Sequence, residues 1–191
     1  MKATIAYLAD ASTENYGKQL MLSAHKISGT GFEAARLPLH VSLKQPFIIP
    51  GLKEMESFFD EFAKGLGPVE FVFDSLQIYK SNVFGYDSGC LSLAVRQERK
   101  LMEIQNNLFL RLEKHFGECP ADHDKDYSFH MTIAIGGTPF QEYGRAYEEM
   151  RRLDYTKRAV FDRLGLFYYD SDEIKQGTYF CYKTVELEEK G

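Results

Sequence analysis

The feature of this 191-residue sequence that most limits its fold is an internal repeat. The tetrad His-Val-Ser-Leu at 40–43 returns as His-Met-Thr-Ile at 130–133, and Val-Phe-Asp at 72–74 returns at 160–162. Two copies of one unit in a chain of this size favour two similar lobes packed into a single domain, 1–191. The joint between the copies is expected near residues 80–88, where glycine, serine and aspartate interrupt the pattern.

Hydrophobic periodicity predicts the secondary structure on both sides of that joint. Alternating apolar residues indicate strands at 2–8, 37–43, 69–79, 89–96, 127–135, 158–168 and 178–187. Apolar residues at three- and four-residue steps indicate helices at 14–27, 52–66, 101–116 and 139–153. This order predicts an α+β fold with lobe one at about 1–80 and lobe two at about 88–187, and the last strand can cross between lobes.

Composition narrows the class of protein. Hydrophobic residues make up 44% of the chain, which excludes intrinsic disorder, and no apolar run is long enough for a transmembrane helix. The three cysteines lack C-x-x-C spacing and favour a reducing compartment over a disulfide framework. The apolar stretch after Lys2 is too short for a signal peptide, so a cytoplasmic location is expected. The net charge of −5 argues against binding long nucleic acid through its phosphates, so any phosphate site should be small.

The repeated tetrads carry the chemistry. Within each tetrad the histidine and the hydroxyl residue share one face of a strand, while the apolar residues hold the other face in the core. Two lobes that face each other would place His40 and His130 across one groove. Histidine titrates near neutral pH, so one imidazole can accept a proton while the other donates one. The Ser42 and Thr132 hydroxyls can donate to phosphate oxygens, which predicts in-line displacement at phosphorus without a metal.

Other polar residues have simpler structural explanations. A single His-x-Ser on a strand is most often an ordinary polar pair, so only the matched pair is informative. The acidic residues at 122–126 lack a metal-ligand spacing and are expected to form a solvated loop. Asp74 and Asp162 are expected at strand bulges, with the orientation of a histidine as the alternative. His25 and His115 are expected at helix ends, where the helix dipole favours them.

The paired tetrads, about 90 residues apart in a duplicated α+β chain, resemble those of the 2H phosphoesterase superfamily. This superfamily includes 2′-5′ RNA ligase-like proteins and cyclic nucleotide phosphodiesterases, and the resemblance extends over nearly the whole chain. It implies a bilobal fold with pseudo-two-fold symmetry, in which two mainly antiparallel sheets flank a central cleft and helices cover the outer faces. It also implies metal-independent hydrolysis of a cyclic phosphodiester, such as a 2′,3′-cyclic phosphate or a related 2′-5′ linkage, with no cofactor.

The resemblance also implies roles for individual residues. His40 and His130 match the catalytic histidines of the family, with His40 as the general acid and His130 as the base. Ser42 and Thr132 match the positions that bind phosphate. Lys44 is the candidate for a basic residue that follows one tetrad on the same face as its histidine and hydroxyl.

The expected partner is a small nucleotide or an RNA end, which suggests a role in RNA processing. Tyr79 and Tyr168, near strand ends, are the candidates for stacking a base. No membrane and no stable protein partner is expected. Two other functions stay open: a non-catalytic RNA- or nucleotide-binding module that uses the same cleft, and a 2′-5′ RNA ligase that runs the same chemistry in reverse.

Overall fold

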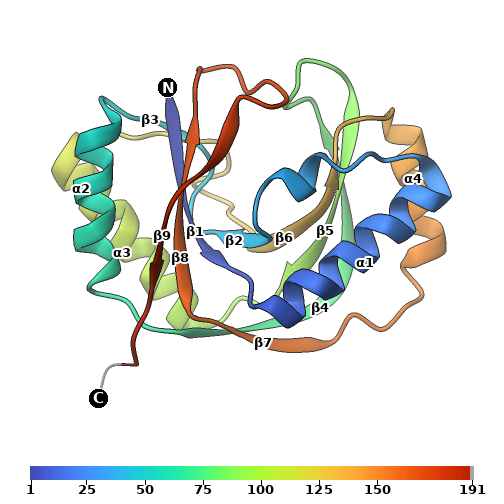
Figure 1. The fold of residues 1–191 in the computed structure, drawn as a ribbon, viewed down its shortest axis with the longest axis horizontal. Coiled ribbons are helices and arrows are strands. Elements are labelled where there is room, and N and C mark those ends of the chain that lie inside the picture. Colours follow the sequence, from blue (N-terminus) through green and yellow to red (C-terminus); the bar gives the residue numbers. More distant parts are fainter. Residues whose placement is uncertain (190–191) are drawn as a thin grey trace.

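The computed structural model describes residues 1–189 and contains two antiparallel β-sheets (Figure 1). In the first sheet the strand order is β2-β1-β8-β9, and β3 also pairs with β1; in the second sheet the order is β6-β5-β4-β7. The strands of the first sheet are β1 (Lys2–Leu8), β2 (His40–Ser42), β3 (Phe47–Ile48), β8 (Arg163–Tyr169) and β9 (Tyr179–Glu186). The strands of the second sheet are β4 (Val69–Ser81), β5 (Ser88–Val95), β6 (His130–Ile135) and β7 (Lys157–Phe161).

Helices cover the outer side of each sheet. They are α1 (Ala11–Ser28), α2 (Leu52–Ala63), α3 (Arg99–Phe116) and α4 (Phe140–Met150), with a short 3-10 helix η1 (Glu33–Arg36). Helices α2 and α3 lie together beside the first sheet, and α1 and α4 lie together beside the second (Figure 1). This leaves the inner faces of the two sheets turned toward the middle of the molecule. The arrangement confirms the expected α+β fold class.

The two sheets do not follow the two halves of the sequence. Strands β8 and β9 come from the second half but pair in the first sheet, whereas β4 comes from the first half and lies in the second sheet. The helices are exchanged in the same way, because α1 covers the second sheet and α3 packs against α2. Sheet membership therefore does not follow the boundaries expected at about 1–80 and 88–187, although the last strand does cross over as that expectation allowed. Local periodicity shows which face of an element is buried but not which element lies beside it.

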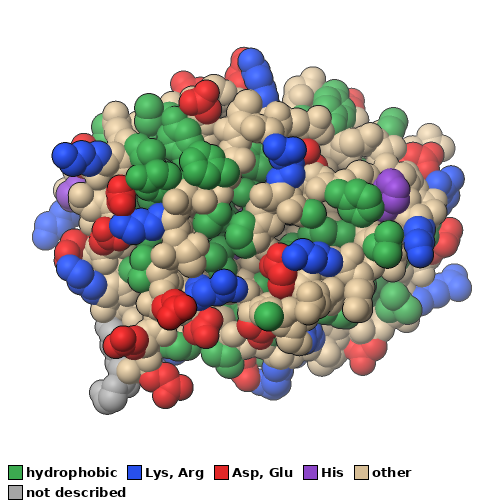
Figure 2. All heavy atoms as spheres, viewed as in Figure 1, with side chains coloured by type: hydrophobic (Ala, Val, Ile, Leu, Met, Phe, Trp, Pro, Cys, Tyr) green, Lys and Arg blue, Asp and Glu red, His purple; other side chains and the backbone are tan. Residues whose placement is uncertain are grey.

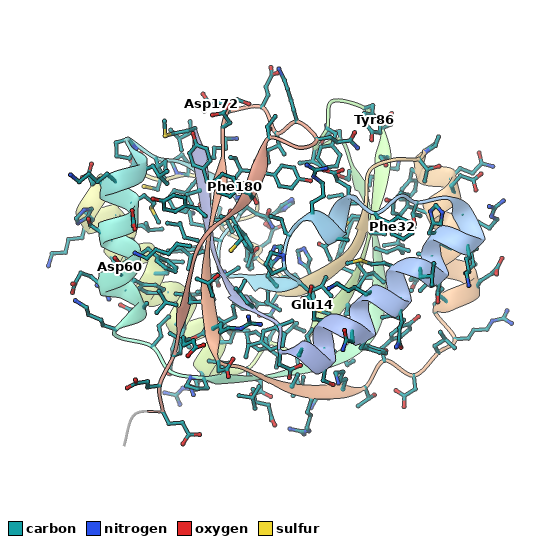
Figure 3. All side chains as sticks on the ribbon, viewed as in Figure 1. Glu14, Phe32, Asp60, Tyr86, Asp172 and Phe180 are labelled. Carbon is teal, nitrogen blue, oxygen red and sulfur yellow. The ribbon has the colours of Figure 1, made fainter. Side chains whose placement is uncertain are left out.

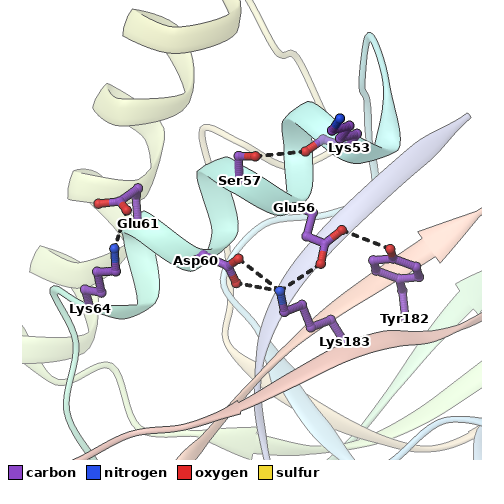
Figure 4. Close-up of polar contacts among 8 residues, drawn as sticks. All are labelled: Lys53, Glu56, Ser57, Asp60, Glu61, Lys64, Tyr182 and Lys183. Carbon is purple, nitrogen blue, oxygen red and sulfur yellow. Dashed lines mark hydrogen bonds and ion pairs between the residues drawn. The ribbon is translucent and has the colours of Figure 1, made fainter.

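Helix α2 shows how a helix is seated on its sheet. Its apolar residues recur at three- and four-residue steps and are buried: Met55, Phe58, Phe59 and Phe62. At the edge of this contact Lys183 of β9 lies 2.8 Å from Glu56 Oε1 and 2.9 Å from Asp60 (Figure 4). Exposed ion pairs of this kind contribute about 0–1 kcal/mol each, so the apolar face supplies most of the stabilisation.

The strand and helix ends confirm several expectations and correct others. Asp74 lies at a register shift between β4 and β5, which confirms the expected bulge. Asp162 separates β7 from β8, so the single strand expected at 158–168 is two strands. His25 and His115 lie in the last turns of α1 and α3, as expected. Within the described residues no helix is long and apolar enough to cross a membrane.

Candidate active site

The two motif strands meet across the middle of the molecule. β2 is the end strand of the first sheet and β6 is the end strand of the second, and the two lie close together. A cavity of about 200 Å³ lies between the sheets, and its lining includes the histidine and the hydroxyl residue of each tetrad: His40, Ser42, His130 and Thr132. The fold thus brings together residues that are 90 positions apart in the chain.

The strand register explains why both polar side chains of a tetrad reach the cavity. On β2, His40 lies opposite Leu8 and Ser42 lies opposite Ala6, so the two share one face of the first sheet. Val41, between them, is fully buried on the other face. On β6 the same alternation buries Met131 and directs its neighbours to the cavity. A shift of one residue in either strand would exchange the two faces.

Each histidine makes the same backbone hydrogen bond. The Nδ1 atom of His40 lies 2.8 Å from the Pro38 carbonyl, and the Nδ1 atom of His130 lies 2.8 Å from the Ser128 carbonyl. A carbonyl oxygen can only accept, so Nδ1 carries the proton in both rings. In the neutral imidazole Nε2 then has the free lone pair. Both rings are therefore oriented and set in one tautomer by the residue two positions earlier.

Burial makes both imidazoles harder to protonate. Burial lowers the pKa of His40 to about 4, against the opposing effect of the Pro38 carbonyl, and the charge of His130 lowers it further. Burial likewise lowers the pKa of His130. The Phe167 ring packs edge-on against His40 with 4.4 Å between ring centroids, which accounts for part of this apolar environment. A phosphate anion between the rings would oppose the effect, because it favours the protonated forms.

Contacts from distant segments hold the backbone on both sides of the first tetrad. Glu14 of α1, labelled in Figure 3, accepts a hydrogen bond from the Leu39 N–H at 2.8 Å. The Tyr127 hydroxyl donates to the Ser42 carbonyl at 2.8 Å. Gln105 Nε2 donates to the Leu43 carbonyl at 3.0 Å. Tyr127 lies three residues before His130. Its hydroxyl therefore ties the segment that leads into one motif strand to the end of the other.

Lys44 does not lie in the cleft. Its ammonium group is buried and lies 2.5 Å from both carboxylate oxygens of Asp124, above the ring of Phe109 at 4.3 Å. Strand β2 ends at Ser42, so its alternation does not continue to Lys44. The expectation of a phosphate-binding lysine at this position is wrong. The expectation of a solvated acidic loop at 122–126 needs correction as well, because Asp124 is held by this ion pair.

The two tyrosines proposed for base stacking lie outside the cavity lining. Tyr79 is 39% exposed, and its ring centroid lies 6.1 Å from that of His130, which places it beside the histidine. Tyr168 follows Phe167 on β8 and so points to the opposite face of the first sheet. Its ring packs against Phe180 at 6.0 Å. The structure therefore contradicts the stacking role for Tyr168 and places Tyr79 near the histidine.

The cavity lining includes residues that the sequence did not single out. Lys2 is the one lysine or arginine among the lining residues of the described chain. It lies opposite Tyr169 in the register of β1 and β8, on the same face as Ala6. The lining also contains Glu33 and the aromatic residues Phe84, Tyr169 and Tyr179. These positions carry no local motif, so only their spatial arrangement shows them.

The acidic and histidine side chains of residues 1–189 form no metal-binding cluster. No group of three or more His, Cys, Asp or Glu side chains in this range is arranged to hold a metal ion. His123, which adopts a left-handed backbone conformation with φ 62°, lies 3.5 Å from Asp126 and forms an exposed pair. The larger hollow of about 780 Å³ lies between α2 and β9, away from both histidines.

The fold and the paired tetrads define a class: a two-sheet α+β protein with two His-x-Ser/Thr strands facing one cleft. Residues 23–173 match the model of the 2′-5′ RNA ligase superfamily. Because this match covers more than half of the chain, the protein belongs to the 2′-5′ RNA ligase superfamily, the 2H phosphoesterases. A search of curated proteins found no match.

Solved structures share the fold at low sequence identity. The protein TT0787 of Thermus thermophilus has a TM-score of 0.65 at 12% identity, over 100% of both chains. E. coli LigT complexed with 3′-AMP has a TM-score of 0.58 at 11% identity, over 98% of both chains. Kluyveromyces marxianus Usb1 has a TM-score of 0.51 at 12% identity, again over 98% of both chains. These similarities confirm the two-sheet architecture with its outer helices.

Proposed function

We propose that the protein is a metal-independent phosphoesterase that hydrolyses a cyclic phosphodiester, such as a 2′,3′-cyclic phosphate of a nucleotide or RNA end or a related 2′-5′ linkage. The observation that carries this proposal is the matched state of the two imidazoles. Both line one cavity, both donate Nδ1–H to a backbone carbonyl, and in both the neutral ring then carries its lone pair on Nε2. Two such rings supply a base and an acid to a single phosphorus centre.

The reaction follows from these groups. A neutral imidazole removes a proton from water through Nε2 while the water oxygen attacks phosphorus. The bond from phosphorus to the leaving ribose oxygen breaks, and the protonated imidazole delivers its proton to that oxygen. By resemblance to the family, His130 is the base and His40 the acid. The Ser42 and Thr132 hydroxyls donate to the non-bridging oxygens, where negative charge accumulates.

The size and charge of the cleft favour a small substrate. A cavity of about 200 Å³ is below the ~300–1,000 Å³ of typical ligand sites, which suits a mononucleotide or one terminal nucleotide. Lys2 is the one lysine or arginine of the described lining and lies opposite Tyr169, away from the tetrads, while Glu33 and Asp122 add two carboxylates. Figure 2 shows basic and acidic side chains intermixed over one face of the molecule, rather than a continuous basic surface. A long RNA duplex would require such a basic surface.

The test is a substrate panel on purified protein: 2′,3′-cyclic nucleotides, short 2′-5′ oligonucleotides, ADP-ribose cyclic phosphate and RNA with a 2′,3′-cyclic end. We expect turnover of at least one of these, unchanged by a chelator. Loss of all activity on chelation would exclude the metal-independent mechanism. Thermal stabilisation by nucleotides without turnover would instead support a binding module, and joining of RNA ends would support the ligase direction.

A further inference from the structure

The cavity extends past the histidines to a group of residues that the proposed chemistry does not use. On β6 the lining runs from His130 to Ile135, five residues or roughly 16 Å along the strand. On β8 it reaches Tyr169, two residues beyond the Phe167 ring that packs against His40. We call this second region the distal end and define it by Glu33, Phe84, Tyr169, Ile174 and Tyr179.

The distal end is mostly apolar and aromatic. Phe84, Ile174 and Leu37 pack against the buried Tyr169 and Tyr179 in a cluster separate from the main core. The rings of Phe84 and Tyr179 are close to parallel, with an interplanar angle of 12° and 6.4 Å between centroids. Phe84 lies on the loop from β4 to β5, two residues from Tyr86, which is labelled in Figure 3. Flat aromatic surfaces of this kind suit the face of a nucleobase.

Glu33 places a carboxylate in these apolar surroundings. Its side chain is 14% exposed. The Tyr179 hydroxyl donates to Oε1 at 2.6 Å, and Arg36 Nε lies 3.6 Å from the same oxygen. Within the described chain Oε2 makes no hydrogen bond. Oε2 is not fully buried, so a donor on a ligand can reach it and bond to it in place of water.

The negative charge of Glu33 restricts what can bind at the distal end. N–H groups on a base edge would be attracted to its carboxylate oxygens, whereas the lone pair of a base nitrogen would be repelled. Guanine presents two adjacent donors, the N1–H and the N2 amino group, and these match the two acceptor oxygens of a carboxylate. Adenine presents an acceptor at N1, and uracil presents only one N–H donor.

We propose that the distal end selects guanine, with Glu33 accepting hydrogen bonds from its N1–H and N2 amino groups. The phosphate of the same nucleotide then lies between His40 and His130, so the substrate class is a guanosine 2′,3′-cyclic phosphate or an RNA end that terminates in guanosine. This inference rests on the proposed function for the position of the phosphate. It adds the base that is recognised and the residue that recognises it.

The experiment compares kcat/KM for the 2′,3′-cyclic phosphates of guanosine, inosine, adenosine and uridine. We expect guanosine to exceed adenosine and uridine at least tenfold, with inosine in between because it lacks the N2 amino group. Glu33→Gln should lower kcat/KM for the guanosine substrate about tenfold or more and change the uridine substrate less than twofold. Glu142→Gln is the matched control, since Glu142 forms a similar surface pair with an arginine three residues later, outside the cleft.

Equal losses on all four substrates in Glu33→Gln would indicate a purely structural role and would overturn the inference, as would equal kcat/KM for all four in the native protein. Binding separates this failure from failure of the proposed function. Calorimetric titration with 3′-GMP and 3′-UMP should show tighter binding of 3′-GMP, abolished in Glu33→Gln. That result without any turnover would refute the phosphoesterase and keep the guanine site. Absence of both binding and turnover would refute both.

Discussion

The two walls of the cleft, β2 and β6, are alike at the histidines and different in their support. Each histidine bonds through Nδ1 to a carbonyl at 2.8 Å. β2, however, has three residues and is followed by contacts from Tyr127 and Gln105, whereas β6 has six residues paired along β5. The comparison shows that the repeated unit is the tetrad with its backbone contact. The surroundings of that unit are specific to each wall.

The position four residues after each histidine makes the difference plain. Lys44 holds this position after β2. Its side chain is buried, and the carboxylate of Asp124 balances its charge. Ala134 holds it in β6 and is buried without a partner. The first wall therefore adjoins a buried charge that needs its counter-charge beside it, and the second does not. The following experiments test where the walls are equal and where they are not.

The largest effect is expected when either histidine is replaced. This experiment tests whether the two histidines are equally necessary for turnover. His40→Ala and His130→Ala should each lower kcat by about 10³-fold or more, because each removes one proton-transfer group. The double variant should lose little beyond the worse single variant, since the two groups act as a unit. His115→Ala, which changes an exposed histidine on α3, is the control. Full activity in either single variant would remove that histidine from the mechanism.

Asp124→Asn tests whether the buried ion pair beside β2 distinguishes the two walls. Leaving the Lys44 ammonium buried without its counter-charge should lower the free energy of unfolding by about 3 kcal/mol. Denaturant unfolding measures this, with Asp126→Asn, an exposed carboxylate of the same segment, as the control. The double variant Lys44→Met with Asp124→Leu should recover most of the loss. No change in Asp124→Asn would show that the first wall does not depend on the pair.

The pH dependence of the rate tests the shared burial of the two rings. One imidazole must be protonated and the other neutral, so kcat/KM should be bell-shaped. Since burial lowers both pKa values, that of His40 to about 4, the optimum should lie below pH 6.5. Above it kcat/KM should fall about tenfold per pH unit. The kcat profile should lie at higher pH, because bound phosphate favours the protonated rings. A kcat/KM optimum above pH 7 would contradict the burial of both rings.

Replacing the hydroxyl residue of either wall should have a smaller effect on kcat/KM than replacing a histidine. Ser42→Ala and Thr132→Val should each lower kcat/KM about ten- to a hundredfold, the range for a hydrogen bond to a charged group. Steady-state kinetics on the best substrate of the panel measures both. Ser57→Ala, on the outer face of α2, should leave the kinetics unchanged. A loss in only one cleft variant would show that one wall alone holds the phosphate.

The smallest effect is expected at the contact that ties the walls together. Tyr127→Phe removes the hydroxyl bond to the Ser42 carbonyl and should cost about 1 kcal/mol of stability, with a few-fold drop in kcat at unchanged KM. Tyr155→Phe removes a similar buried bond, to the Met150 carbonyl at 2.8 Å, away from the cleft. It should cost similar stability and leave kcat unchanged. Equal kcat values in the two variants would assign Tyr127 a structural role only.

Much of the candidate site could be read from local sequence. Alternation around His40 and His130 places each histidine and hydroxyl on a strand face opposite the core, and the structure has both pairs in the cavity lining. The bulge at Asp74 and the helix-end positions of His25 and His115 also follow from residues that are near in the sequence. These features depend on residues within a few positions of one another, where backbone geometry sets the direction of each side chain.

Tertiary structure alone decided the rest. Lys44 follows the end of β2, so its direction is set by Asp124, 80 positions away, and not by strand alternation. Lys2, Glu33 and Tyr179 reach the cavity from a strand, a short 3-10 helix and a hairpin that no motif connects. Long-range packing also decides which strands and helices are exchanged between the two halves of the chain. A sequence pattern determines which face of an element is apolar, but the partner that covers it is set by packing over the whole chain.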